Sequence, residues 1–154
     1  MATVDIVTTT KRAGYPGKGG NPNARHIVQR KFTGAELNAA GTPSADTFKF
    51  AEIKKGQLVR EVITTVLDSD ANAITLDIGY IDDNGSSATA FETNAALNAT
   101  GVTASSDDQL VMSTDGFLTI TVSAAIENAT EFIVSAEIED YSLTLRDNTL
   151  AAAI

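Results

Sequence analysis

Residues 74–80 read Ile-Thr-Leu-Asp-Ile-Gly-Tyr. Apolar side chains occupy every second position of this stretch, with threonine and aspartate between them. Because successive side chains of a β-strand point to opposite faces, the alternation predicts a strand with one buried face. Asn84-Gly85 follows a few residues later, and this dipeptide is a strong signal for a two-residue hairpin turn. The stretch therefore predicts an antiparallel sheet.

Similar patterns lie on both sides of this strand. Residues 58–67 are apolar or β-branched on both faces, which is typical of a central strand that is covered on both sides. Residues 90–98 are the one segment that predicts a short helix. The further predicted strands are residues 26–33, 46–53, 109–113, 117–123 and 131–145. Seven or eight strands separated by short turns predict an all-β fold, an antiparallel β-sandwich or jelly roll.

The charge of the chain changes sign near residue 35. Residues 1–35 contain six basic residues and one acid, a net charge of +5, whereas the whole chain carries −9, so residues 36–154 carry −14. The first part is also rich in glycine, which opposes regular structure. We therefore expect three parts: a basic extended arm over residues 1–35, a β-sandwich body over residues 36–147 and a C-terminal tail over residues 148–154.

We expect the arm and the tail to contact partners. Residues 2–9 are β-prone but too few to form a sheet alone, so they should pair with another segment. The basic charge suits an acidic protein surface, and the acidic body would repel nucleic acid. The alternative is an arm without contacts of its own. The expected contact residues are Val4, Ile6, Lys11, Arg12, Tyr15, Arg25, Arg30, Lys31, Leu150 and Ile154.

We find no motif that predicts catalysis. His26 is the only histidine, and neither a nucleophile nor a carboxylate lies near it in the sequence. The chain has no cysteine, which excludes disulfides and thiolate chemistry. Residues 14–20 are glycine-rich but lack the Gly-Lys-Ser/Thr ending of a phosphate-binding loop. We therefore expect a protein that is not an enzyme.

Residues 68–72, Asp-Ser-Asp-Ala-Asn, begin like a calcium-binding loop. Ala73 and Gly79 stand where such a loop needs glycine and glutamate, so an Asp- and Asn-rich turn is the favoured interpretation and a weak Ca²⁺ site the alternative. We expect no cofactor. No apolar run is long enough to span a membrane, and the start lacks the pattern of a signal peptide, so we expect synthesis in the cytoplasm.

Residues 46–62 and 75–79 together resemble a known pattern. A strand of the type Phe-x-Phe-x-x-Ile leads through a glycine-containing turn into Leu-Val-x-x-Val, and Thr-Leu-Asp-Ile-Gly follows. This order is similar to that of the capsid decoration, or cement, proteins of tailed bacteriophage heads, over residues 46–82. The amino-terminal arm also looks similar to the arms that tie such proteins to their neighbours.

The resemblance implies a structural protein of the virion without catalytic residues. Such a protein is made in the host cytoplasm and lies on the outer surface of the capsid. It cements the shell by binding the major capsid protein and neighbouring copies of itself, as a homotrimer or another small homo-oligomer. The alternative is a tail, fibre or host-surface module that binds carbohydrate, although the chain has no tryptophan to stack on a sugar.

Overall fold

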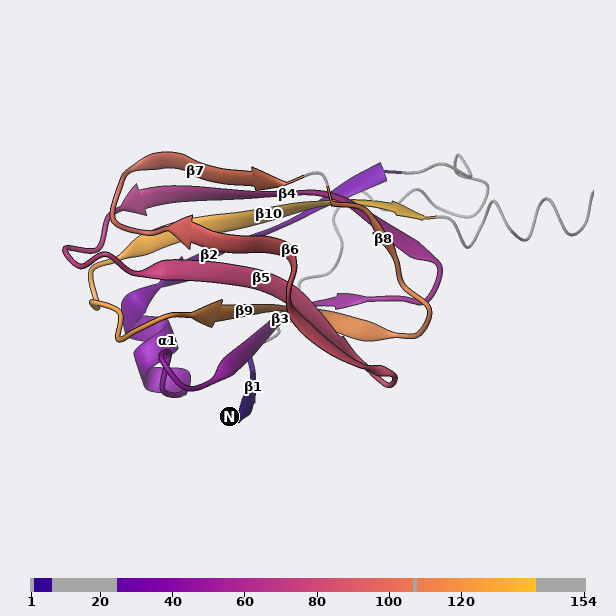
Figure 1. Cartoon of the computed structure of the whole chain (residues 1–154), viewed down its shortest axis with the longest axis horizontal. Helices are drawn as coiled ribbons and strands as arrows, with labels where there is room; N and C mark the ends of the chain where they lie inside the picture. Colours follow the sequence, from indigo (N-terminus) through magenta and orange to yellow (C-terminus); the bar gives the residue numbers. More distant parts are fainter. Residues whose placement is uncertain (1, 7–24, 107, 141–154) are drawn as a thin grey trace, which may run out of the picture.

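The computed structural model describes residues 2–6, 25–106 and 108–140. Within these ranges the chain forms two β-sheets that pack face to face, with one short helix at their side (Figure 1). The elements are β1 (Thr3–Asp5), β2 (Arg25–Thr33), α1 (Gly34–Ala40), β3 (Thr47–Ile53), β4 (Gln57–Asp68), β5 (Thr75–Asp82), β6 (Gly85–Ala96), β7 (Gly101–Ser106), β8 (Leu110–Val111), β9 (Gly116–Val122) and β10 (Glu131–Asp140).

The two sheets have the strand orders β1-β3-β9-β5-β6 and β2-β10-β4-β7, and we call them sheet A and sheet B. The short strand β8 pairs with β4 at the end of sheet B. All of these neighbours are antiparallel except β1, which runs parallel to β3. The predicted antiparallel β-sandwich is therefore confirmed.

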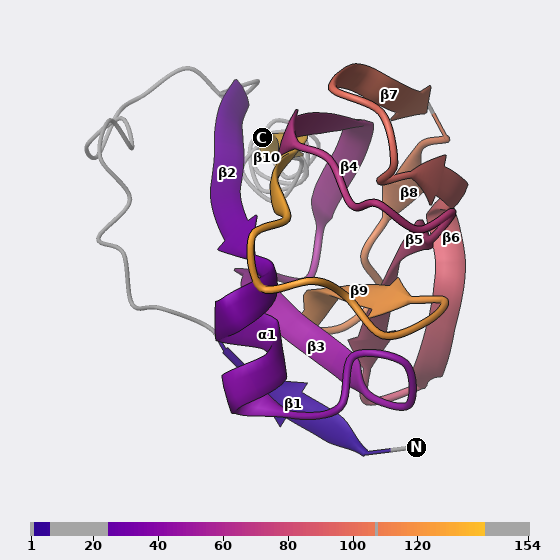
Figure 2. The same ribbon diagram turned by 90° about the vertical axis from the view of Figure 1, so that its left-hand side faces the viewer.

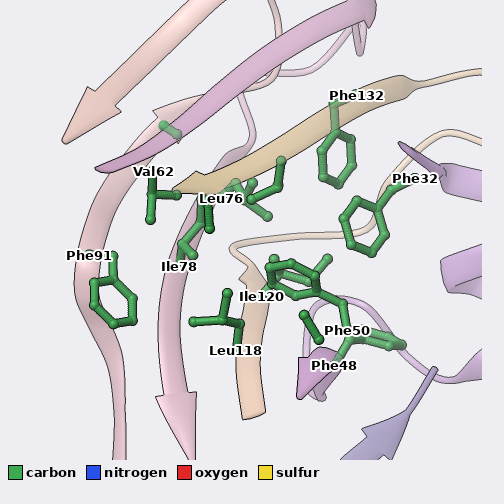
Figure 3. Close-up of a cluster of buried hydrophobic side chains, with 14 of the residues drawn as sticks. Phe32, Phe48, Phe50, Val62, Leu76, Ile78, Phe91, Leu118, Ile120 and Phe132 are labelled. Carbon is green, nitrogen blue, oxygen red and sulfur yellow. The ribbon is translucent and has the colours of Figure 1, made fainter. Parts of the chain in front are cut away.

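The core lies between the sheets and is made by the alternating apolar faces of the strands (Figure 3). Phe32 of β2 stacks on Phe132 of β10 with ring centroids 5.2 Å apart, and it meets Phe50 of β3 edge-on at 5.4 Å. Offset and edge-to-face pairs of this kind add to the free energy gained by burying the rings. The alternating apolar residues of β5, β9 and β10 are buried in this core, except Tyr80 of β5, which is partly buried.

Residues 25–33 belong to the sandwich rather than to an extended arm. β2 pairs with β10 along its whole length, from Thr33 opposite Glu131 to Arg25 opposite Glu139. The arm expected over residues 1–35 therefore cannot include this strand. The expectation rested on the positive charge of the segment, but glutamates of β10 neutralise that charge where the two strands pair.

The helix predicted at residues 90–98 is wrong, because this segment forms the second half of β6 and the loop after it. β6 follows β5 with irregular register: Ile78 lies opposite Glu92 and Tyr80 opposite Ser87, so extra residues of β6 bulge out between these two pairs. Pairing with β5 and burial of Phe91 in the core outweigh the weak helical propensity of the segment. Gly79 makes the arrangement possible, since a Cβ there would lie 1.8 Å from the Ser87 carbonyl oxygen.

The helix in the described structure is α1, which the sequence reading missed. It begins after Thr33, whose Oγ1 accepts a hydrogen bond from the Glu36 N–H at 3.1 Å, a typical N-terminal cap. Leu37 is buried, and Asn38 donates to the Ile126 carbonyl oxygen. In the view turned by 90°, α1 lies between β2 of sheet B and β1 of sheet A (Figure 2).

Candidate functional site

The amino-terminal strand β1 is the edge strand of sheet A and pairs with the start of β3. Beyond the strand itself, two further backbone hydrogen bonds fasten its ends. The Thr47 N–H donates to the Ala2 carbonyl oxygen at 3.0 Å, and the Ile6 N–H donates to the Lys49 carbonyl oxygen at 3.1 Å. The β-prone segment at the amino terminus thus pairs with a strand of its own chain over residues 3–5.

The two apolar residues of this segment face the core. Val4 and Ile6 are partly buried and pack against the hydrophobic cluster between the sheets. Gly41, just after α1, leaves the space that Val4 needs, because a Cβ at Gly41 would lie 3.0 Å from Val4 Cγ2. The Ala2 N–H donates a hydrogen bond to the Asp46 carboxylate at 3.3 Å.

Arg30 of β2 closes the other end of this contact. Its Nη1 donates to the carbonyl oxygen of Ile6, its Nη2 forms an ion pair with Glu36 of α1, and its guanidinium carbon lies 5.3 Å from the centroid of the Phe32 ring. The Arg30 side chain is 13% exposed. One partly buried cation thus joins β1, β2 and α1. We call the surface formed by Arg30, Gly41 and residues 46–49 the strand seat.

Arg25 and Lys31 also lie in β2, but their ion-pair partners are on β10. Lys31 pairs with Glu131 at 2.7 Å, and Arg25 pairs with Glu137 and Glu139 at 3.4 Å each. Both basic side chains are about half exposed, so each pair contributes roughly 0–1 kcal/mol to stability. Of the expected contact residues, the structure therefore brings Val4, Ile6 and Arg30 together and places Arg25 and Lys31 elsewhere on β2.

The remaining expected contact residues are Lys11, Arg12, Tyr15, Leu150 and Ile154, which lie outside the described residues.

The acidic turn after β4 is organised around Asp70. This buried carboxylate accepts hydrogen bonds from the N–H groups of Asn72 and Glu127 and from the Thr130 hydroxyl, each at 2.9 Å. Burial by itself raises the pKa of Asp70, but together these hydrogen bonds favour the charged form more strongly, so the pKa lies below its usual value. Asp70 thus ties the β4–β5 loop to the β9–β10 loop.

In residues 2–6, 25–106 and 108–140, no group of three or more histidine, cysteine, aspartate or glutamate side chains is arranged to hold a metal ion. Over the same ranges, none of the helical structure has the length and apolar character that crossing a bilayer requires.

The helix α1 beside the strand seat could have been found in the sequence, whereas the seat itself could not. Thr33 and Glu36 have the spacing of a helix cap, which predicts that α1 begins there. Arg30 and Gly41 carry no comparable signal, because their roles depend on contacts with residues 24 and 37 positions away, respectively.

Comparison with known proteins gives matches at the level of structure. No protein-family model matches the chain, and no curated protein matches its sequence. A chain in the capsid of Ralstonia phage GP4 superimposes with a TM-score of 0.62 at 14% identity, covering 88% of this chain and 97% of that one. A chain in the acidic stable capsid structure of Helicobacter pylori bacteriophage KHP30 gives a TM-score of 0.57 at 9% identity, covering 77% and 90%. A chain in the capsid asymmetric unit of cyanophage Pam1 gives 0.54 at 20% identity, covering 86% and 96%.

These identities are low, so the likeness concerns the fold. The chain has the β-sandwich fold of chains found in three bacteriophage capsid structures, and each of those chains is matched over nearly its whole length. The resemblance to phage capsid-associated proteins seen in residues 46–82 is confirmed at this level.

Proposed function

We propose that this chain is a structural protein of the virion that decorates and cements the capsid. The observation that carries the proposal is the match to chains of three phage capsids over 90–97% of their length. A rigid sandwich with short loops suits a protein that acts through its surfaces, and this role requires no catalysis.

The proposed partners are the major capsid protein and neighbouring copies of the chain, on the outer surface of the shell. We propose a homotrimer or another small homo-oligomer as the unit that binds. Each contact can be weak, because many symmetry-related contacts on one particle add to a large total affinity. The amino-terminal segment and the tail residues Leu150 and Ile154 are the proposed contact regions.

The test is the copy number of the chain in purified virions, measured by quantitative mass spectrometry against the major capsid protein. A ratio near one to one is expected for a protein that cements the whole shell. A few copies per particle would replace this role with that of a vertex, fibre or tail component. Absence from the particles would overturn the proposal, and binding to a glycan array would then support a carbohydrate-binding module.

The structure also decides how a deletion should be designed. Removing residues 1–35 would remove β2 and with it Phe32, which lies in the core. A deletion that tests the role of the amino-terminal segment in capsid binding must therefore end before Arg25.

A further inference from the structure

We propose that residues 2–6 of one copy occupy the strand seat of a neighbouring copy, so that neighbouring copies are joined by exchange of β1. The inference deepens the proposed function, because it names the residues through which copies of the chain bind one another. It is argued from the contacts of the seat, the length of the connection to β2 and the distribution of charge.

The strand seat recognises a short extended segment at several points. Its backbone groups bind both ends of the segment, through Thr47 and Lys49. The core receives two apolar side chains at alternate positions, those of Val4 and Ile6. Main-chain hydrogen bonds combined with sockets for alternate side chains are the means by which a sheet edge binds an added strand.

The residues of β1 are joined to the rest of the sandwich by a long connection. Arg30 contacts the Ile6 carbonyl oxygen, and Arg25 precedes Arg30 on the same strand by five residues, about 17 Å at the usual rise of a strand. Residues 7–24, which we call the linking segment, number 18. A chain of that length can span up to about 60 Å, so it can reach any seat within that distance, whether on its own copy or on a neighbour.

Exchange leaves the contacts of the seat unchanged. The same hydrogen bonds, the same burial of Val4 and the same Arg30 contact form whether the segment comes from the same copy or from a neighbour. For this reason strand exchange is a route to oligomers that costs little free energy. Whether β1 binds its own copy or a neighbour then depends on the linking segment and on the surfaces that it joins.

The charge of the linking segment favours a position between two copies. It carries +3 through Lys11, Arg12 and Lys18 and contains no acid, whereas the chain as a whole carries −9, which leaves −12 for all other residues. Two such acidic bodies repel each other when they approach. Two basic segments that cross between them reduce this repulsion, which favours the exchanged arrangement.

The absence of cysteine from the sequence allows a direct test with introduced thiols. Thr3 and Thr47 lie opposite each other in the pairing of β1 with β3. Neighbouring strands are about 4.8 Å apart, within the Cα–Cα range of a disulfide. The experiment co-expresses full-length Thr3→Cys and Thr47→Cys chains with different tags and oxidises the purified protein mildly.

A disulfide between a Thr3→Cys chain and a Thr47→Cys chain is expected, and mass spectrometry should map it to these two positions. The matched control pairs Thr3→Cys with Thr93→Cys, an exposed position on β6 at the opposite edge of sheet A, and should give no such product. The inference is overturned if the mixed chains form no heterodimer while the double variant Thr3→Cys/Thr47→Cys closes within one chain. It is equally overturned if the Thr93→Cys control cross-links to the same extent.

This result is independent of the copy number in virions. Abundant protein in particles with disulfides only within single chains would leave the proposed function standing and overturn the exchange. Exchange in the purified protein, combined with absence from particles, would support the inference and overturn the proposed function.

Discussion

Thr64 places a hydroxyl group in the apolar core. The residue is fully buried on β4, between Val134 of β10 and Ala104 of β7, and its Oγ1 has no hydrogen-bond partner among the described residues. A buried hydroxyl without a partner lowers stability by about 1–3 kcal/mol, and valine has nearly the same shape. We therefore expect Thr64→Val to raise the free energy of unfolding by about 1 kcal/mol and the melting temperature by about 2–4 °C.

Thr130→Val is the matched control for this substitution. Its hydroxyl is also buried but donates to Asp70 at 2.9 Å, so the same change should lower the melting temperature. Thermal unfolding followed by circular dichroism measures both variants. Equal losses in the two would show that the Thr64 hydroxyl is as well satisfied as that of Thr130.

Asp70 gives the sandwich a dependence on pH. Its pKa is lower in the folded chain than its ordinary value of 3.8, so the folded state binds fewer protons than the unfolded state as the pH approaches that value. The stabilisation is present above that value and is lost as the pH falls below it. We expect Asp70→Asn to be less stable than the unchanged protein at pH 7 and the difference to shrink by pH 3. Denaturant unfolding at the two pH values tests this, and a difference that does not change with pH would contradict it.

At the scale of the elements, the side chain of Arg30 holds the end of the amino-terminal segment that forms β1. Replacing Arg30 with alanine removes the donor to the Ile6 carbonyl oxygen and leaves the Glu36 carboxylate without its cation. We expect this variant to lose about 1–3 kcal/mol of stability, because partly buried polar groups lose their partners. We also expect faster amide hydrogen exchange in residues 47–49, measured by mass spectrometry.

Lys31→Ala is the control, since it removes an ion pair on the exposed face of the same strand. Its side chain is 51% exposed, and the expected change in stability is about 0–1 kcal/mol with unaltered exchange in residues 47–49. If both variants speed exchange there equally, Arg30 does not hold β1 in place.

The elements also show where sequence reading succeeds. Strands such as β5 and β9 alternate over most of their length, so their inward faces follow from the pattern and their bounds follow to within two residues. β6 could not be read in this way, because its bulge and its buried Phe91 are fixed by pairing with β5. β7 was missed because Gly101–Ser106 contains few apolar residues, and its position depends on β4.

At the scale of the whole molecule, the division at residue 35 was the least accurate prediction. The prediction assigned β2 to a separate arm because the strand is positively charged. In the structure, this positive charge lies in ion pairs with glutamates of β10. Ion pairs between segments that are distant in the sequence leave no local signal. For the same reason the strand seat could not be predicted from the sequence. Val4 and Ile6 could be recognised because they occupy alternate positions, as in a strand with one buried face.

The length of the linking segment leads to a prediction for the whole molecule. Deleting residues 10–21 leaves six residues between Ile6 and Arg25, which span about 20 Å at most. The shortened connection therefore reaches fewer seats on other copies than the full connection of about 60 Å does. We expect the shortened protein to give less Thr3→Cys–Thr47→Cys heterodimer than the full-length protein. An equal yield of heterodimer in the shortened protein would show that the linking segment does not set the reach of β1.

The order of the strands along the chain also determines when sheet B can close. Among the residues that the structure describes, β2 pairs in sheet B with β10 alone, and their paired residues Thr33 and Glu131 lie 98 positions apart. Ribosomes add roughly 5–20 residues per second, so β2 waits about 5–20 s for the strand that holds it. During translation Arg30 is thus not yet fixed, and the strand seat is incomplete. Chains that stop before residue 131 lack β10 altogether, so the order of the strands excludes truncated products from any assembly built through this contact.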